Sequence, residues 1–280
     1  MFRSCRAYRL LKEEQLLPFM RRLLSVFVTA TCLAFSLVRA AAVTLDWNAV
    51  TWTPGALNGS YDVDPSRAGN DISLALTGNT GQFAPKNGNT IPAILNIIEG
   101  GLSPAQNSLV LHLDLANQSQ GVTMTVNFSA LYTQGVSNVS FTLFDVDFSS
   151  GAFQDQIRSI QALSIDGTTL IAPTITTSSA NTLTGTGLNQ VVNGISTNTD
   201  TGPTSGNGNV TISFGAAAIK SFMFTYGSGT NAPADPTTQG IALHNISFTP
   251  VPEINPAWSA LLSCLAATGL VLRHRSHFRK

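Results

Sequence analysis

Residues 43–250 contain no cysteine, because Cys5, Cys32 and Cys264 all lie outside this range. The same range has one glutamate, Glu99, and only four lysine or arginine residues. The absence of cysteine excludes disulfide and thiol chemistry from the central region. Four scattered cations cannot neutralise a run of phosphates, so a nucleic-acid-binding body is excluded as well.

The formal net charge of zero hides an uneven distribution along the chain. Residues 1–42 carry a net charge of +5 and residues 251–280 a net charge of +3. The region between them sets twelve carboxylates against four cations, a net charge of −8. Apolar residues make up 43% of the chain, which is enough to bury a core and excludes a disordered protein. Two basic ends around an acidic middle indicate a topological signal at each end.

The first basic segment has the layout of a secretory signal peptide. Met20 and two arginines precede an apolar run over residues 23–38, and Ala40 and Ala42 each offer a small residue for cleavage. The sequence therefore predicts a signal peptide over residues 1–42, with Met20 as an alternative start. A retained membrane anchor is the other interpretation, although sixteen apolar residues are few for a membrane span.

The second basic segment has the layout of a stop-transfer signal. An apolar run over residues 257–272 begins beside Trp258 and ends at the basic tail 273–280. Sixteen helical residues extend about 24 Å, which is less than the ~30 Å hydrocarbon core, but snorkelling of Arg273 can cover the difference. We expect a short transmembrane helix with its tail on the cytoplasmic side. A buried C-terminal helix is the alternative.

The motif Val251-Pro252-Glu253, followed by this apolar run and the basic tail, resembles the PEP-CTERM sorting signal. The resemblance covers residues 251–280 and implies that an exosortase in the membrane cuts near the Pro-Glu motif during export. Ile254 stands where the family usually has proline, so the resemblance leaves the cleaved bond open. It implies a destination in the cell envelope or the extracellular polysaccharide matrix.

The body between the two signals has the pattern of consecutive β-strands. Alternation is clear where Val122, Met124 and Val126 share one face and Thr123 and Thr125 the other. Nine such runs, without a long helical period, predict an all-β fold over residues 43–250: an antiparallel, jelly-roll-like β-sandwich. The runs are residues 43–47, 71–77, 109–115, 122–128, 139–148, 156–165, 210–214, 220–226 and 241–248.

Two stretches interrupt this rhythm. Residues 78–108 are rich in glycine and proline and predict a long excursion with one ordered piece near residues 94–98. Residues 173–208 are dominated by Thr, Ser, Asn and Gly and predict exposed loops or weak edge strands.

Three aspartates form a candidate metal site. The alternation of polar and apolar residues inverts at Phe144, which predicts a bulge or bend and places Asp145 and Asp147 on one strand face. With Asp155 a loop away, a structural Ca²⁺ ion bound by the three carboxylates is the natural hypothesis. The alternative is the ordinary solvated face of a strand.

The same region resembles exported bacterial jelly-roll domains that are found ahead of PEP-CTERM signals. The matching motifs are Phe-Asp-x-Asp at residues 144–147, Asp-Gln at 155–156 and Gln-Gly-Ile-Ala-Leu at 239–243. The resemblance supports the fold and implies no biochemical role.

Aromatic residues suggest a second function class. If exposed, Trp47, Trp52 and Tyr61 would stack on sugar rings, which makes a carbohydrate-binding or adhesive module an alternative function. Their more common role is packing in a sheet core.

Catalytic candidates are weak, and we predict no catalytic residue. An aspartate-dependent glycoside hydrolase would rely on Asp145 and Asp147, yet neighbours on one strand do not approach a sugar from opposite sides. A Ser-His-Asp hydrolase would have to use His112 or His244, and the body has no Gly-x-Ser-x-Gly elbow. We expect His112 on a strand surface. The leading hypothesis is a non-enzymatic exported protein whose partners are an exosortase, the membrane and exopolysaccharide.

Overall fold

The central region of the chain is seen in a computed structural model, which describes residues 41–195 and 201–253. The predicted signal peptide and the predicted transmembrane helix with its basic tail lie outside these residues, so they remain predictions. Within the two described ranges, no helix has the length and apolar character needed to cross a membrane.

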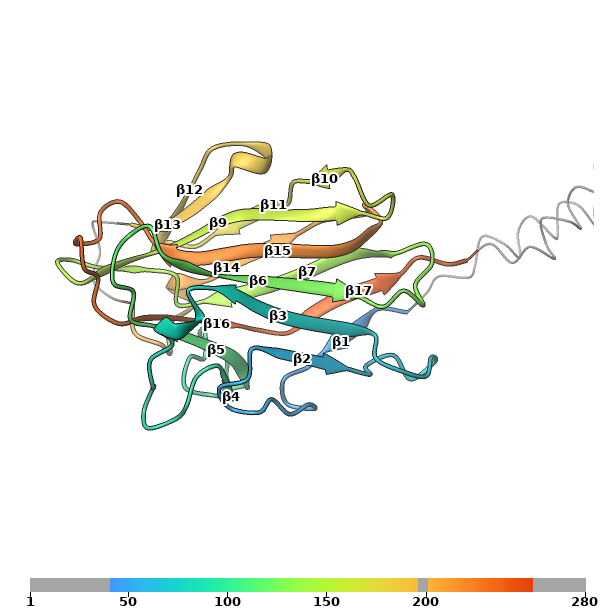
Figure 1. Cartoon of the computed structure of the whole chain (residues 1–280), viewed down its shortest axis with the longest axis horizontal. Coiled ribbons are helices and arrows are strands. Elements are labelled where there is room, and N and C mark those ends of the chain that lie inside the picture. The colour runs from blue at the N-terminus through green and yellow to red at the C-terminus, as the bar shows by residue number, and fades with distance from the viewer. Residues whose placement is uncertain (1–40, 196–200, 254–280) are drawn as a thin grey trace, which may run out of the picture. The chain divides into compact units, whose positions relative to one another are not determined.

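Strands make up nearly all the regular structure of the described residues. Each of the nine runs expected from the sequence forms a strand, and every named pairing between strands is antiparallel. Two of the runs are divided: residues 139–148 into β7 and β8, and residues 241–248 into β16 and β17. The prediction of an all-β antiparallel fold is confirmed, and the arrangement is consistent with a β-sandwich (Figure 1).

One group of strands pairs in the order β2–β3–β6–β15–β9–β13–β12, with β8 and β10 also paired to β9. Its members are β2 (Asn58–Tyr61), β3 (Ile72–Gly78), β6 (Gly121–Phe128), β8 (Phe148–Ser149), β9 (Phe153–Ser164), β10 (Leu170–Ile171), β12 (Asn181–Thr184), β13 (Val191–Gly194) and β15 (Ile219–Ser228).

The second group is built around β7, which pairs with β14 on one side and with β16 and β17 on the other. Beyond these, β5 pairs with β16, β4 with β5, β1 with β17, and β11 with β14. Its members are β1 (Val43–Leu45), β4 (Ala93–Leu95), β5 (Ser108–Leu113), β7 (Val136–Phe144), β11 (Thr174–Thr177), β14 (Val210–Ser213), β16 (Gln239–Leu243) and β17 (Ile246–Pro250). Short 3₁₀ helices form at η1 (Thr80–Gln82), η2 (Gly187–Asn189) and η3 (Gly206–Gly208).

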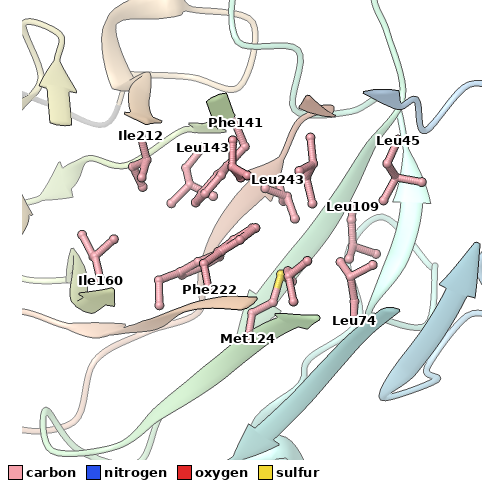
Figure 2. Close-up of a cluster of buried hydrophobic side chains, with 14 of the residues drawn as sticks. Leu45, Leu74, Leu109, Met124, Phe141, Leu143, Ile160, Ile212, Phe222 and Leu243 are labelled. Carbon is pink, nitrogen blue, oxygen red and sulfur yellow. The ribbon is translucent and has the colours of Figure 1, made fainter. Parts of the chain in front are cut away.

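The two groups face each other through aromatic rings. Phe222 of β15 stacks on Phe141 of β7 with centroids 4.8 Å apart, and Phe128 of β6 lies 4.9 Å from Phe248 of β17. Figure 2 shows this layer, with Ile212, Phe141 and Leu143 on one side and Ile160, Phe222 and Met124 on the other. Contacts of this kind add about 0.5–1.5 kcal/mol per pair to the burial of apolar area, so this layer is the main core.

A second, smaller core lies on the other face of β5 and β16. Phe144, Val110 and Ala242 are buried there with Ile91 and Ile98 from the glycine- and proline-rich excursion. Every residue of β5 is therefore buried, since alternate side chains belong to different cores. The prediction of an ordered piece in this excursion is confirmed at β4, and the excursion covers the sheet.

We predict that Phe222→Ala lowers the free energy of unfolding by about 3–5 kcal/mol, the usual cost of removing a buried phenylalanine ring. Phe222 also contacts Phe128 and Phe214, so the cavity would open in the middle of the aromatic layer. Urea denaturation measures the change. As a control, Leu131→Ala, at a side chain that is 48% exposed, should change the value by no more than about 0.5 kcal/mol. Equal costs for both variants would contradict this core.

Candidate functional site

Strand β7 ends where the alternation of polar and apolar residues inverts. β7 ends at Phe144, and Asp145 adopts a left-handed backbone with φ of 68°. Phe144 belongs to the smaller core, whereas Leu143 and Val146 belong to the main core. The predicted bend is therefore confirmed, but the expectation that Asp145 and Asp147 share one strand face is wrong, because neither residue lies within a strand.

Asp155 is held in the core by hydrogen-bond donors. Its side chain is fully buried, its Oδ1 accepts a hydrogen bond from the Tyr226 hydroxyl at 2.6 Å, and its Oδ2 accepts from the Asp147 backbone N–H at 3.1 Å. Burial, and then repulsion from the Asp147 carboxylate, raise the pKa of Asp155 well above its usual value. Asp147 is itself buried, and its Oδ2 accepts from both the backbone N–H and the hydroxyl of Thr201.

A second buried carboxylate, Asp71 just before β3, also accepts hydrogen bonds from a tyrosine hydroxyl and from backbone N–H groups. Asp71 accepts from the Tyr132 hydroxyl at 2.8 Å and from the backbone N–H groups of Val63 and Asp64. Asp64 accepts from the Ser66 hydroxyl, and this bond lowers the pKa of Asp64. These carboxylates tie loops to strands, which is a structural role.

The aromatic residues near the start of the body belong to the core. Trp47, Trp52 and Tyr61 are all buried, and the Trp47 ring makes edge contacts with Trp52 at 6.5 Å and Tyr61 at 6.0 Å. Burial also raises the pKa of Tyr61 to about 12. The packing interpretation is thus confirmed, and these three rings offer no open surface on which a sugar could stack.

The two histidines of the body differ in position: His112 lies in β5, and His244 is a partly buried residue between β16 and β17. The expectation of an exposed His112 is wrong: it is only 6% exposed, its Nδ1 lies 3.2 Å from the Ala84 carbonyl oxygen, and burial lowers its pKa. His244 stacks on Phe144, and its Nδ1 lies 3.3 Å from the Ser108 hydroxyl. Ser108 is fully buried, so this serine–histidine pair presents no nucleophile to a substrate.

An open groove lies over the outer face of β9, β12 and β13. Its volume is about 460 Å³, within the usual range of ligand sites. Most of its lining residues carry neutral amides or hydroxyls, and their carbon atoms together with Val191 and Ile195 supply apolar surface: Gln154, Gln156, Thr182, Thr184, Val191, Asn193, Gly194, Ile195, Thr230 and Asn231. Among the described residues that line it there is no acid, no base and no aromatic ring.

Strand alternation explains why this face is polar. Val192 of β13 and its partner Ile157 of β9 point into the main core and are fully buried. The neighbouring pair, Asn193 and Gln156, must therefore point outward. The floor is Gln154, whose Nε2 donates to the Gly194 carbonyl oxygen and whose Oε1 accepts from the Asn231 backbone N–H.

Sequence analysis missed this site because its signal is weak. β12 and β13 come from the Thr- and Asn-rich stretch 173–208, for which loops or weak edge strands were expected. The local cue is the alternation of Thr182, Leu183 and Thr184 and of Val192 and Asn193. That cue cannot place the two strands beside β9.

Asp147 and Asp155, two of the three aspartates predicted to bind calcium, already accept hydrogen bonds from donors within the protein. Both oxygens of Asp155 accept hydrogen bonds, and among the described residues no group of three or more His, Cys, Asp or Glu side chains is arranged to hold a metal ion. The calcium ion stays a prediction. If calcium binds, the protein should have a higher melting temperature in calcium than in chelator, because a ligand bound only by the folded state stabilises that state. Identical melting curves would dismiss it.

Asp155 predicts a specific pH dependence of stability. A carboxyl group whose pKa is raised on folding contributes stability below its unfolded pKa of about 3.9, and loses this contribution as the pH rises through the folded value. Asp155→Asn should therefore gain stability relative to the wild type as the pH rises from about 4 to about 8. Urea denaturation across this range measures the difference.

Asp166→Asn is the matched control, with the opposite sign. Hydrogen bonds from the Thr169 hydroxyl and nearby backbone N–H groups lower the pKa of Asp166, so its contribution is present at neutral pH and lost in acid. Its variant should lose stability relative to the wild type as the pH rises from about 2 to about 5, and should change little above that range. Parallel trends in the two variants would contradict the assignment of Asp155.

The sequence matches no family model and no curated protein. Three solved structures show some similarity in shape. The first is a carbohydrate-binding module specific for non-crystalline cellulose, with a TM-score of 0.25 and 10% identity, covering 52% of this chain and 75% of that one. The second is the K1 cleaved adhesin domain of Lys-gingipain from Porphyromonas gingivalis, with a TM-score of 0.31 and 10% identity, covering 76% of this chain and 99% of that one. The third is the family 11 carbohydrate-binding module of a cellulosomal cellulase from Clostridium thermocellum, with a TM-score of 0.23 and 11% identity, covering 77% of this chain and 98% of that one. At such TM-scores the similarity says nothing about the ligand or the activity of this chain.

Proposed function

We propose that this chain is a non-enzymatic exported protein, sorted by its C-terminal segment to the cell envelope or the extracellular polysaccharide matrix, where its β-domain binds polysaccharide. The observation that carries the proposal is the groove over β9, β12 and β13, whose lining of neutral amides and hydroxyls suits a polyhydroxylated ligand. This replaces the earlier hypothesis of binding through Trp47, Trp52 and Tyr61, which are buried.

A non-catalytic role agrees with how the titratable groups are used. Asp71 and Asp155 each accept hydrogen bonds from a tyrosine hydroxyl and from backbone N–H groups. The serine–histidine pair is closed off by the burial of Ser108. These groups hold the fold together, and the groove itself is lined by residues that bind through hydrogen bonds and carry no acid–base function.

The position of the sorting motif supports processing by an exosortase. Val251 follows directly after β17, and its backbone N–H donates to the Gly135 carbonyl oxygen at 3.0 Å. Glu253 lies 3.7 Å from the Arg67 guanidinium, at the surface. A cut near this motif would leave all the strands of the described residues in the mature protein. The proposal therefore combines a detachable signal with a body that is complete without it.

Expression of the full chain with a different tag at each end tests export and sorting. We expect a mature product that has lost both tags and is found, by fractionation and immunoblotting against the body, in the envelope or matrix fraction. Substitution of Val251, Pro252 and Glu253 by alanine should leave the C-terminal tag attached. A mature-sized product that stays in the cytoplasm, or a chain that keeps residues 20–42, would refute export.

A further inference from the structure

A row of polar side chains crosses three strands at the centre of the groove. Thr182 of β12 is the cross-strand partner of Asn193 of β13, and Asn193 is the partner of Gln156 of β9. Directly opposed residues of antiparallel strands project from the same face. The three side chains therefore stand side by side on the outer face, and all three line the groove.

The guanidinium of Arg158 sets the orientation of the side-chain amides in this row. Its Nη1 donates to Gln156 Oε1 at 2.9 Å, and Gln156 Nε2 in turn donates to Asn193 Oδ1 at 2.9 Å. Because arginine has only donors, Gln156 must turn its oxygen toward Arg158 and its nitrogen toward Asn193. Asn193 must then turn its oxygen toward Gln156, which leaves its NH₂ group as the part that can donate to a ligand.

Arg158 itself is committed to the protein. Its Nη2 also lies within hydrogen-bond distance of the carbonyl oxygens of Ser119 and Gln120, and burial lowers its pKa. Arg158 is not among the described residues that line the groove, and those residues offer no cation to a carboxylate or sulfate. The net charge of −8 over residues 43–250 further disfavours the approach of a polyanion.

We propose that the Asn193 side chain, oriented by Gln156 and Arg158, donates to an oxygen of a neutral polysaccharide that lies in this groove, with the Thr182 hydroxyl as a second contact. The inference rests on the proposed binding of polysaccharide and adds its site and ligand class. A neutral sugar supplies hydroxyl, ring and glycosidic oxygens that accept from an amide, and the row provides donors without charge. Acidic polysaccharides built from uronic acids are disfavoured, because the described lining residues supply no cation and residues 43–250 carry a net charge of −8.

The test uses the full chain, purified in mild detergent, and isothermal titration with defined tetrasaccharides. The neutral probes are β-1,4-linked tetrasaccharides of glucose, mannose and xylose, and the acidic probes are tetrasaccharides of galacturonic and mannuronic acid. We expect binding of at least one neutral probe and none of the acidic probes. In amide NMR spectra, the NH₂ signals of Asn193, identified by their loss in Asn193→Ala, should shift on addition of that probe.

Two variants locate the site. Asn193→Ala should weaken binding by about three- to tenfold, the usual effect of losing one hydrogen bond. Thr182→Ala changes an exposed side chain that the fold does not need, and should weaken binding several-fold even if Asn193→Ala proves poorly folded. Asn58→Ala changes an exposed side chain of β2, at the far end of the same strand group, and is the matched control that should bind like the wild type.

Three outcomes would overturn the inference. Wild-type affinity in both Asn193→Ala and Thr182→Ala, with neutral probes still bound, places the site elsewhere and leaves polysaccharide binding intact. Equal or tighter binding of the uronic acid probes removes the neutral ligand class. Failure of the wild-type chain to bind any probe or any insoluble polysaccharide removes the proposed polysaccharide binding itself, and this inference with it.

Discussion

The aromatic layer between β7 and β15 is the contact on which the rest of the structure depends. Stacking of Phe141 on Phe222 marks the buried face of β7 and of β15. Side-chain alternation then assigns the next residues of these strands, and of the strands paired with them, to the core or to the outer surface. Through this rule, burial of Val192 and Ile157 places Asn193 and Gln156 outside. The groove is thus a consequence of core packing on the opposite side of the same strands.

Scarcity of cations gives the buried carboxylates an unusual set of partners. Asp71 and Asp155 each accept a hydrogen bond from a tyrosine hydroxyl, Tyr132 and Tyr226. An unpaired buried carboxylate is costly, and with four cations in the whole body the chain meets the demand with neutral donors. The aspartates that attract attention in the sequence therefore act mainly as anchors for loops, and binding chemistry is left to amides and hydroxyls.

The local alternation of polar and apolar residues was sufficient to predict most of the strands and the break after Phe144, since alternation can be read within one segment. It was insufficient for His112, which alternates with leucines as a surface residue would but is covered by the excursion at Ala84. It also could not show that Phe144 and Leu143 serve different cores. Burial on both faces depends on a segment remote in sequence, which a single strand pattern does not record.

The candidate site divides in the same way. The sequence by itself determined the strand-rich, cysteine-free and acidic character of residues 43–250 and the order of the signals around them, because composition and short-range periodicity are written in consecutive residues. Only the tertiary structure brought Thr182 and Asn193 beside the Gln156–Arg158 pair of β9. The reason is physical: register between strands is set by the packing of the whole core, so the Thr- and Asn-rich stretch alone does not record that β13 pairs with β9.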